Sequence, residues 1–263
     1  MSAPSAPVAA YVLHLRAFRE SGAIVDFFTR DHGRVSVFAH GVGPSGSGKR
    51  PRNGTAGLLQ PFTSLLVSWR GAADGGQLAV VEAAGPPRTL PPARLMSGFY
   101  LNELLLKLMA RDDAHPNVFD QYHAALEVLA AAVDQSPLAR RAEAGALRRF
   151  EHALLEALGL CGDFSIEAGT GEPLDPQATY RLRPGLGLMR VASGVRGLWG
   201  ADLLAMAEGR LDEDAVLATA RLALRELLDA ALDGRPLLTR QVARGVANVM
   251  QSSRRAGRDK PDS

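Results

Sequence analysis

Short apolar runs separated by polar turns fill the first third of the chain, and this pattern predicts β-strands. β-branched and aromatic residues dominate residues 23–29 and 34–39. The turn between these two runs ends at Gly33, which predicts a hairpin. Further strands are predicted at residues 8–18, 63–69 and 77–82. About five short strands with glycine-rich corners in so short a stretch predict a small closed barrel.

The apolar spacing becomes helical after residue 84. Four prolines within residues 86–92 mark the change, because proline interrupts regular structure. Ser136 and Thr239 are predicted to be N-caps, and Gly159 is predicted to end a helix. The apolar stripes predict helices at residues 93–111, 118–133, 137–158, 200–208, 212–233 and 239–250.

A third pattern interrupts the helices at about residues 160–197. This stretch is rich in glycine and holds two strand-like runs, residues 179–183 and 187–191. We therefore predict an α+β protein with an OB-fold barrel in residues 1–84 and a helical domain in residues 85–263. The helical domain carries a small irregular β insert, and its polar, basic end from about residue 251 is expected to be mobile.

The amino-acid composition predicts a folded protein without disulfides or membrane-spanning segments. The chain has 263 residues, of which 46% are hydrophobic, as expected of a folded protein with a sizeable core. Cys161 is the single cysteine, so an internal disulfide and a cysteine-based zinc site are excluded. The first residues do not resemble a signal peptide, and no apolar run reaches about 18 residues. We expect a cytoplasmic protein that does not bind membranes.

The charge is unevenly distributed along the chain. Residues 1–80 hold eight Lys or Arg and four Asp or Glu, whereas the net charge of the whole chain is only +2. The glycine-rich stretch 40–52 contains Lys49, Arg50 and Arg52 and no acidic residue. Cations held beside a barrel face can bind phosphates with little dependence on base sequence. A solvated loop without a ligand is the alternative interpretation of the same residues.

Two other functions remain open from the residues. The stretch from Gly43 to Lys49 imitates a phosphate-binding P-loop, which would suit a nucleotide-hydrolysing enzyme. However, Arg50 replaces the Ser or Thr that binds Mg²⁺, and Pro51 disfavours the helix that should follow. The carboxylates show no pairing suited to acid–base catalysis. A protein-interaction module whose barrel binds no nucleic acid is the other alternative.

Several segments, in this order and spacing, resemble the RecO family of recombination mediators. They span about residues 10–245. The segments that carry the resemblance are residues 19–29, 33–35, 59–62, 100–104, 115–116, 119–122, 148–151, 154–155, 158–159 and 239–240.

The resemblance implies an N-terminal OB-fold, a helical domain and a small insert. It implies a non-enzymatic DNA repair and recombination protein that binds single- and double-stranded DNA and anneals complementary strands. The implied partners are the C-terminal tail of single-stranded DNA-binding protein, RecR and, indirectly, RecA, and the implied location is the bacterial nucleoid. Some members carry a four-cysteine zinc module in the insert. Only Cys161 is present here, so we predict no metal and no cofactor.

Two sets of binding residues follow from these considerations. For DNA we predict Arg16, Arg34, His40, Lys49, Arg50 and Arg52. Phe27, Phe28 and Phe38 are expected to lie mostly in the core, with at most one of them stacking on a base.

An acidic, hydrophobic peptide tail needs an apolar groove and a cation for its terminal carboxylate. Arg148 is the first choice for that carboxylate contact. Simple packing of the helices is the alternative role for the apolar members of this set. The full set predicted to bind the tail is Tyr100, Leu104, Phe119, Tyr122, Arg148, Arg149, Phe150 and Leu154.

Overall fold

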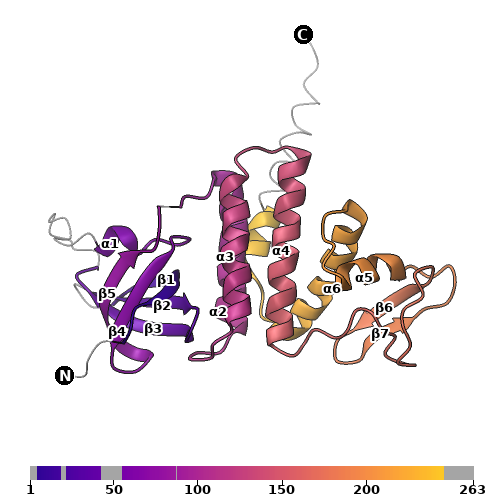
Figure 1. Cartoon of the computed structure of the whole chain (residues 1–263), viewed down its shortest axis with the longest axis horizontal. Helices are drawn as coiled ribbons and strands as arrows, with labels where there is room; N and C mark the ends of the chain where they lie inside the picture. The colour runs from indigo at the N-terminus through magenta and orange to yellow at the C-terminus, as the bar shows by residue number, and fades with distance from the viewer. Residues whose placement is uncertain (1–4, 19–21, 43–54, 87, 246–263) are drawn as a thin grey trace, which may run out of the picture.

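The computed structural model describes residues 5–18, 22–42, 55–86 and 88–245. The predicted DNA-binding residues Lys49, Arg50 and Arg52, the whole P-loop-like stretch and the basic tail from residue 251 lie outside the described residues. The molecule is elongated, with a barrel at one end, upright helices in the middle and a small sheet at the other end (Figure 1).

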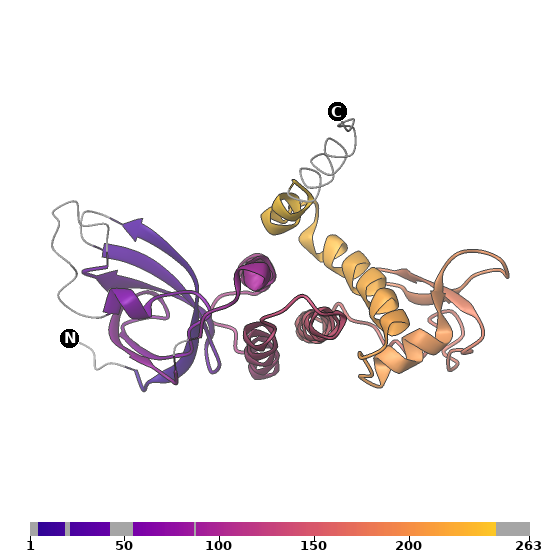
Figure 2. The ribbon, with the colours of Figure 1, turned by 90° about the horizontal axis from the view of Figure 1, so that it is seen from above.

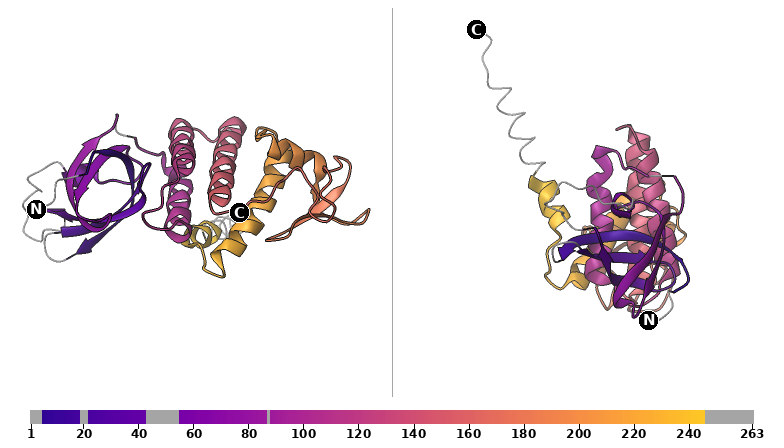
Figure 3. Two further views of the ribbon diagram at one scale, coloured as in Figure 1. Left: turned by 60° about the horizontal axis from the view of Figure 1, so that its bottom comes forward. Right: turned by 90° about the vertical axis from the view of Figure 1, so that its left-hand side faces the viewer.

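The barrel consists of five strands. They are β1 (Val8–Phe18), β2 (Gly22–Thr29), β3 (Gly33–His40), β4 (Leu65–Arg70) and β5 (Asp74–Ala83). The strands close in the order β1-β2-β3-β5-β4, and β3 runs parallel to β5 while the other pairs are antiparallel. This is the five-stranded arrangement of the OB-fold, so the predicted fold is confirmed (Figure 3). One short helix, α1 (Thr55–Leu58), precedes β4.

Alternation along the strands separates the inside of the barrel from its outer face. On β3, Val35, Val37 and Ala39 are buried, whereas Phe38 is partly exposed and His40 exposed. Successive side chains of a strand point to opposite faces. Phe38 and His40, which alternate with the buried Val37 and Ala39, therefore face outward.

The helical domain begins with a short 3-10 turn, η1 (Pro92–Arg94). The helices are α2 (Leu95–Leu108), α3 (Pro116–Ala131), α4 (Pro137–Ala157), α5 (Gly200–Ala207) and α6 (Asp214–Leu232). Ser136 caps α4 as predicted, since its Oγ accepts a hydrogen bond of 3.1 Å from the Ala139 amide. Gly159 ends that helix with φ of +68°, a conformation that favours glycine.

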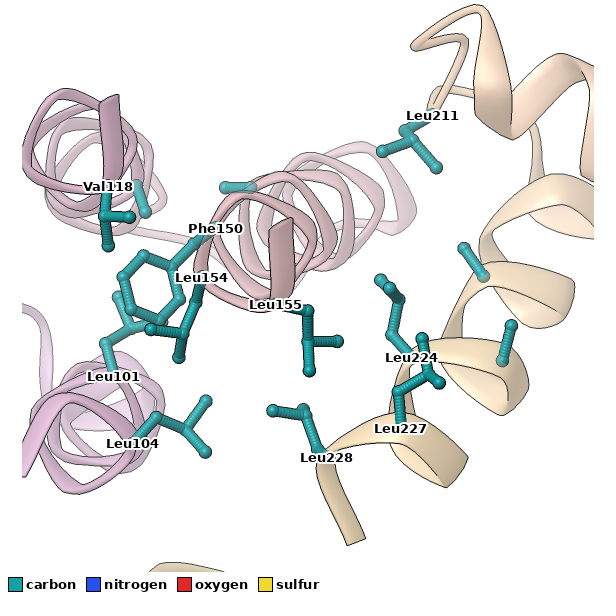
Figure 4. Packing of buried hydrophobic residues seen from close by; sticks show 14 of the residues in the cluster. Leu101, Leu104, Val118, Phe150, Leu154, Leu155, Leu211, Leu224, Leu227 and Leu228 are labelled. Carbon is teal, nitrogen blue, oxygen red and sulfur yellow. The ribbon is translucent and has the colours of Figure 1, made fainter. Parts of the chain in front are cut away.

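The helices α2, α3 and α4 stand side by side, and α6 leads from them towards the small sheet (Figure 2). Their apolar faces meet in one core, in which Phe150 and Leu154 of α4 point between α2 and α3 while Leu155 points towards α6 (Figure 4). Burial of leucine and phenylalanine side chains contributes roughly 1.5–3 kcal/mol each. This core therefore dominates the stability of the domain.

The predicted insert contains a three-stranded sheet in the order β7-β6-β8. The strands are β6 (Thr179–Arg183), β7 (Gly187–Arg190) and β8 (Leu198–Trp199). The sequence predicted the first two strands but not β8, which is only two residues long. Tyr180, Leu182 and Leu188 are buried and belong to the same core as the helices. Apolar packing thus ties the insert to α6.

The barrel joins the helical domain through a buried aromatic cluster. Tyr11 of β1 and Phe28 of β2 pack against Phe119 and Tyr122 of α3, with ring centroids 5.1–6.0 Å apart. The Tyr122 hydroxyl donates to Asn102 Oδ1 at 2.6 Å, and Asn102 Nδ2 in turn donates to the Leu13 carbonyl of β1 at 3.1 Å. The two domains therefore share packed contacts rather than a flexible linker.

A further helix begins at residue 238 and is described as far as residue 245. Its predicted cap, Thr239, is wrong because Thr239 lies inside the first turn. The cap comes instead from Glu103 of α2, whose carboxylate accepts hydrogen bonds from the Leu238 amide at 2.7 Å and the Thr239 amide at 3.0 Å. Free amides at a helix start need such acceptors, and α2 supplies them from a distant part of the chain.

Candidate nucleic-acid interface

The outer face of β1, β2 and β3 gathers the candidate residues of the barrel. Strand pairing sets Arg16 opposite Ile24, and Ile24 opposite Phe38. Two residues further on, Phe18 pairs with Gly22, which pairs with His40. The register therefore places Arg16, Phe18, Phe38 and His40 on neighbouring strands of one face.

Three of these side chains form an aromatic row. The rings of Phe18 and Phe38 lie 5.7 Å apart and those of Phe38 and His40 lie 4.3 Å apart, both in edge-to-face geometry. Gly22 lies directly beneath Phe38, because a Cβ there would approach that ring to 2.3 Å. Phe18 keeps 40% of its surface exposed. We call Phe18, Phe38 and His40 the aromatic row.

Arg16 is exposed next to the aromatic row. Phe27 and Phe28 are fully buried, so Phe38 is the one phenylalanine of the three named from the sequence that reaches this face. Phe18 was missed by the sequence-based prediction. The available signal was its position at the end of a predicted strand, where the barrel interior no longer covers a side chain.

Arg34 lies elsewhere and has structural partners. Its Nη1 donates to the carbonyls of Leu106 and Met109 at 2.8 Å each, at the end of α2. Desolvation by burial lowers the pKa of this guanidinium. The side chain therefore connects β3 to the helical domain, and the structure does not bring it together with Arg16.

Most of the predicted tail-binding residues lie in the core. Leu104, Tyr122, Phe150 and Leu154 are fully buried and Phe119 retains only 5% exposure. These side chains pack against other helices or against the barrel. In the described structure they line no open groove, which agrees with the alternative role that the sequence left open for them.

The two arginines at residues 148 and 149 differ in their surroundings. The Arg148 guanidinium donates to the buried Glu151 carboxylate at 2.5 Å, and the Tyr100 hydroxyl donates to the same carboxylate at 2.7 Å. Burial raises the pKa of Glu151, with Arg148 acting in the opposite direction. Arg148 is thus engaged in neutralising a buried charge, whereas Arg149 is exposed.

Tyr100 contacts Glu151 on one side and Arg240 on the other. Arg240, in the helix that begins at residue 238, lies over its ring at 5.7 Å and donates to its hydroxyl at 3.4 Å. Burial, followed by the nearby Glu151 charge, raises the pKa of Tyr100. This residue therefore acts as a hydrogen-bond donor at a contact between three helices.

The described residues offer neither a metal-binding cluster nor a reactive thiol. No group of three or more His, Cys, Asp or Glu side chains within them could hold a metal ion. The Cys161 thiol has its pKa raised to about 12 by burial and by Glu156, so it is a poor nucleophile at neutral pH. Within the same residues, no helix is long and apolar enough to cross a lipid bilayer.

The protein is a two-domain OB-fold protein, in which a closed barrel packs directly on a helical domain with a β insert. Comparison with known sequences identifies the particular family. Models of the N-terminal and C-terminal domains of Recombination protein O match residues 5–86 and 92–235. The chain belongs to the RecO family of DNA repair proteins.

Relatives support the family over nearly the whole chain. The chain is 40% identical to the DNA repair protein RecO of Thiobacillus denitrificans over 243 residues, which cover 91% of each sequence. It is 37% identical to DNA repair protein RecO of Methylococcus capsulatus over 235 residues, covering 89% of this chain and 91% of the relative. For the RecO of Stutzerimonas stutzeri the identity is 40% over 234 residues, with the same coverage.

Proposed function

We propose that this protein is a recombination mediator that binds single- and double-stranded DNA and anneals complementary strands. In this proposal it contacts the C-terminal tail of single-stranded DNA-binding protein and, with RecR, assists the loading of RecA, without catalysing a reaction. The observation that carries the DNA-binding part is the partly exposed aromatic row beside Arg16 on the outer face of an OB barrel.

The chemistry of this face suits a single strand. Bases stack on aromatic rings, and each stacked base contributes about 1–3 kcal/mol. In this proposal the exposed guanidinium of Arg16, beside the aromatic row, contacts a phosphate next to a stacked base. The sequence continues from His40 into the stretch with Lys49, Arg50 and Arg52, whose charges would add salt-dependent affinity.

For the peptide tail we propose Arg149 as the carboxylate contact. Arg148 was the first choice from the sequence, but its guanidinium is paired with Glu151 inside the protein. Arg149 is exposed on the same helix, α4, and its Nη1 lies over the backbone at Gly145. A free, exposed guanidinium can bind a terminal carboxylate through two hydrogen bonds.

Fluorescence anisotropy with a labelled oligonucleotide at two salt concentrations tests the DNA-binding face. The double variants Phe18→Ala/His40→Ala and Lys49→Glu/Arg50→Glu are expected to weaken binding roughly tenfold or more, the first through stacking and the second through charge. Only the second should also flatten the salt dependence. Arg140→Glu, a charge reversal at an exposed site on α4, is the matched control.

Wild-type affinity of both double variants at both salt concentrations would contradict the proposal. Steady ATP hydrolysis by the purified chain, with or without DNA, would favour the nucleotide-hydrolysing alternative. Absence of oligonucleotide binding in dilute buffer would favour a protein-interaction module.

The tail contact has a separate test. Arg149→Ala is expected to weaken binding of an acidic tail peptide while leaving the affinity for bare oligonucleotide unchanged. An equal loss of both affinities would contradict the assignment of DNA and tail to different surfaces.

A further inference from the structure

The three-stranded sheet of the insert presents an unusual combination of side chains to solvent. Trp199 of β8 is 54% exposed and Met189 of β7 is 41% exposed. Arg181 of β6 pairs directly with Met189, and Thr179 pairs with Trp199. Residues 179 and 181 lie on the same face of β6 because they are two apart. One face of this small sheet therefore carries an exposed indole, a methionine and an arginine.

This face borders a hollow of about 830 Å³ between the sheet, the loop before β8 and α6. Its charged lining consists of Arg181, Arg190, Arg196 and Glu226. Leu222 of α6 adds an apolar side chain that is 55% exposed. The hollow is thus open and lined by both apolar and polar side chains, among them three cations and one carboxylate.

The cations are available to a ligand. Arg190 donates to Asp175 at 2.9 Å, in an exposed pair that contributes at most about 1 kcal/mol. Arg181 and Arg196 form no ion pair with any residue that the structure describes. A hollow with this surplus of positive charge complements an anionic ligand.

We propose that this face of the insert, centred on Trp199, Arg181 and Arg196, is a second binding surface for single-stranded nucleic acid. A base stacks on the exposed indole, as bases stack on the aromatic side chains of four-stranded RNA-binding sheets and of single-strand-binding grooves. The two unpaired guanidinium groups contact the neighbouring phosphates. This inference rests on the proposed DNA-binding function and adds a site that lies outside the barrel.

The position of this surface, far from the barrel, suits a protein that holds two strands at once. The barrel and the insert sheet lie at opposite ends of the molecule, separated by the upright helices (Figure 1). The packed core between them fixes the distance between the two surfaces. Such an arrangement lets one molecule hold two strands, or two parts of one strand, which is what bringing complementary strands together requires.

Tryptophan fluorescence reports on the second surface directly, because the chain has only two tryptophans. Trp69 is buried in the barrel at 4% exposure, whereas Trp199 is exposed. A short oligothymidylate is titrated into the full-length protein while emission is recorded, with anisotropy of a labelled strand measured in parallel. We expect quenching in the wild type and its loss in Trp199→Phe.

Charge reversal tests the phosphate contacts. Arg181→Glu/Arg196→Glu is expected to shift the midpoint of the Trp199 quench by roughly tenfold or more to higher oligonucleotide concentration. Arg140→Glu should leave it unchanged. The double reversal and Trp199→Ala should also slow annealing of complementary strands, whereas Lys49→Glu/Arg50→Glu should leave the Trp199 quench in place.

The following outcomes distinguish failure of this inference from failure of the proposed function. Oligonucleotide binding by anisotropy without any change in Trp199 emission would overturn the second surface and leave the barrel function standing. No binding by either signal would overturn both. Quenching of Trp199 by an acidic peptide but not by the oligonucleotide would overturn the inference in favour of a protein partner.

Discussion

At the scale of single residues, the surroundings of a charge decide its role. Arg34, Arg148 and Arg149 are equivalent cations in the sequence. In the structure Arg34 bonds two carbonyls of the helical domain, and Arg148 pairs with a carboxylate that is only 1% exposed. Only Arg149 remains exposed. A test of ligand binding must therefore separate loss of a contact from loss of stability.

Arg148→Ala is expected to destabilise the protein by about 3–5 kcal/mol, because it leaves Glu151 buried without its cation. The double variant Arg148→Met/Glu151→Gln removes both charges and should recover most of that loss. Urea denaturation measures both. Equal destabilisation of the single and double variants would contradict the structural role of this pair.

The same pair predicts a pH dependence. Burial raises the pKa of Glu151, and removal of Arg148 takes away the main effect that opposes this rise. A carboxyl whose pKa is raised on folding binds its proton more tightly in the native state. The stability of Arg148→Ala should therefore fall as pH rises from about 4.5, the ordinary glutamate range, towards the raised value. A flat stability profile above that pH would contradict this expectation.

At the scale of elements, the helix that starts at residue 238 depends on a cap supplied by α2. Glu103 accepts from two amides at its start and from the Thr239 hydroxyl, and the Lys107 amine lies 3.6 Å from the same carboxylate. Burial alone would raise the pKa of Glu103. The hydrogen bonds from Thr239 and Leu238 together outweigh it, so the pKa is lowered.

Protonation of Glu103 at low pH should destabilise the helix that starts at residue 238. A carboxyl whose pKa is lowered on folding stabilises the folded state above its ordinary pKa, and this stabilisation is lost as pH falls through the lowered value. Hydrogen exchange of the amides in residues 238–245 should therefore accelerate below about pH 4. Glu103→Ala should accelerate it already at pH 7, by about 1–2 kcal/mol of local stability. Glu172→Gln, at an exposed site, is the control, and equal exchange in both variants would contradict the cap.

At the scale of the whole molecule, a continuous core extends from the barrel to the insert. It includes Tyr11 and Phe28 of the barrel, Phe119 and Tyr122 of α3, and Tyr180 of the insert. A second cluster fills the interior of the barrel. Because the aromatic cluster at the junction is fully packed, we expect barrel and helices to unfold together.

Phe119→Ala should destabilise the protein by about 3–5 kcal/mol through the cavity that it leaves. It should also separate the unfolding of the barrel from that of the helices, because Tyr11 and Phe28 lose a shared partner. Denaturation followed by Trp69 emission and by far-UV circular dichroism would show two midpoints in the variant and one in the wild type. Trp199→Phe is introduced in both proteins so that Trp69 alone reports. Coincident midpoints in Phe119→Ala would contradict a coupling through this cluster.

Local sequence determined the order and the type of nearly every element. The barrel strands, the capped α4 and the first two strands of the insert follow from periodicity and turn residues, which act over a few neighbours. The family also follows from the order of segments along the chain.

Tertiary structure alone decided which side chains are free to bind. Phe38 and Phe28 lie in similar strands, yet one faces solvent and the other the helices. Arg149 and Arg148 are adjacent, yet one is exposed and the other neutralises Glu151. Whether a side chain is exposed depends on segments that are distant in the sequence but packed together in the fold. The contact of Glu103 with residues 238–245 is an example of such packing. Local patterns carry no information about those partners, so the outer aromatic row and the platform at Trp199 became visible only in the folded molecule.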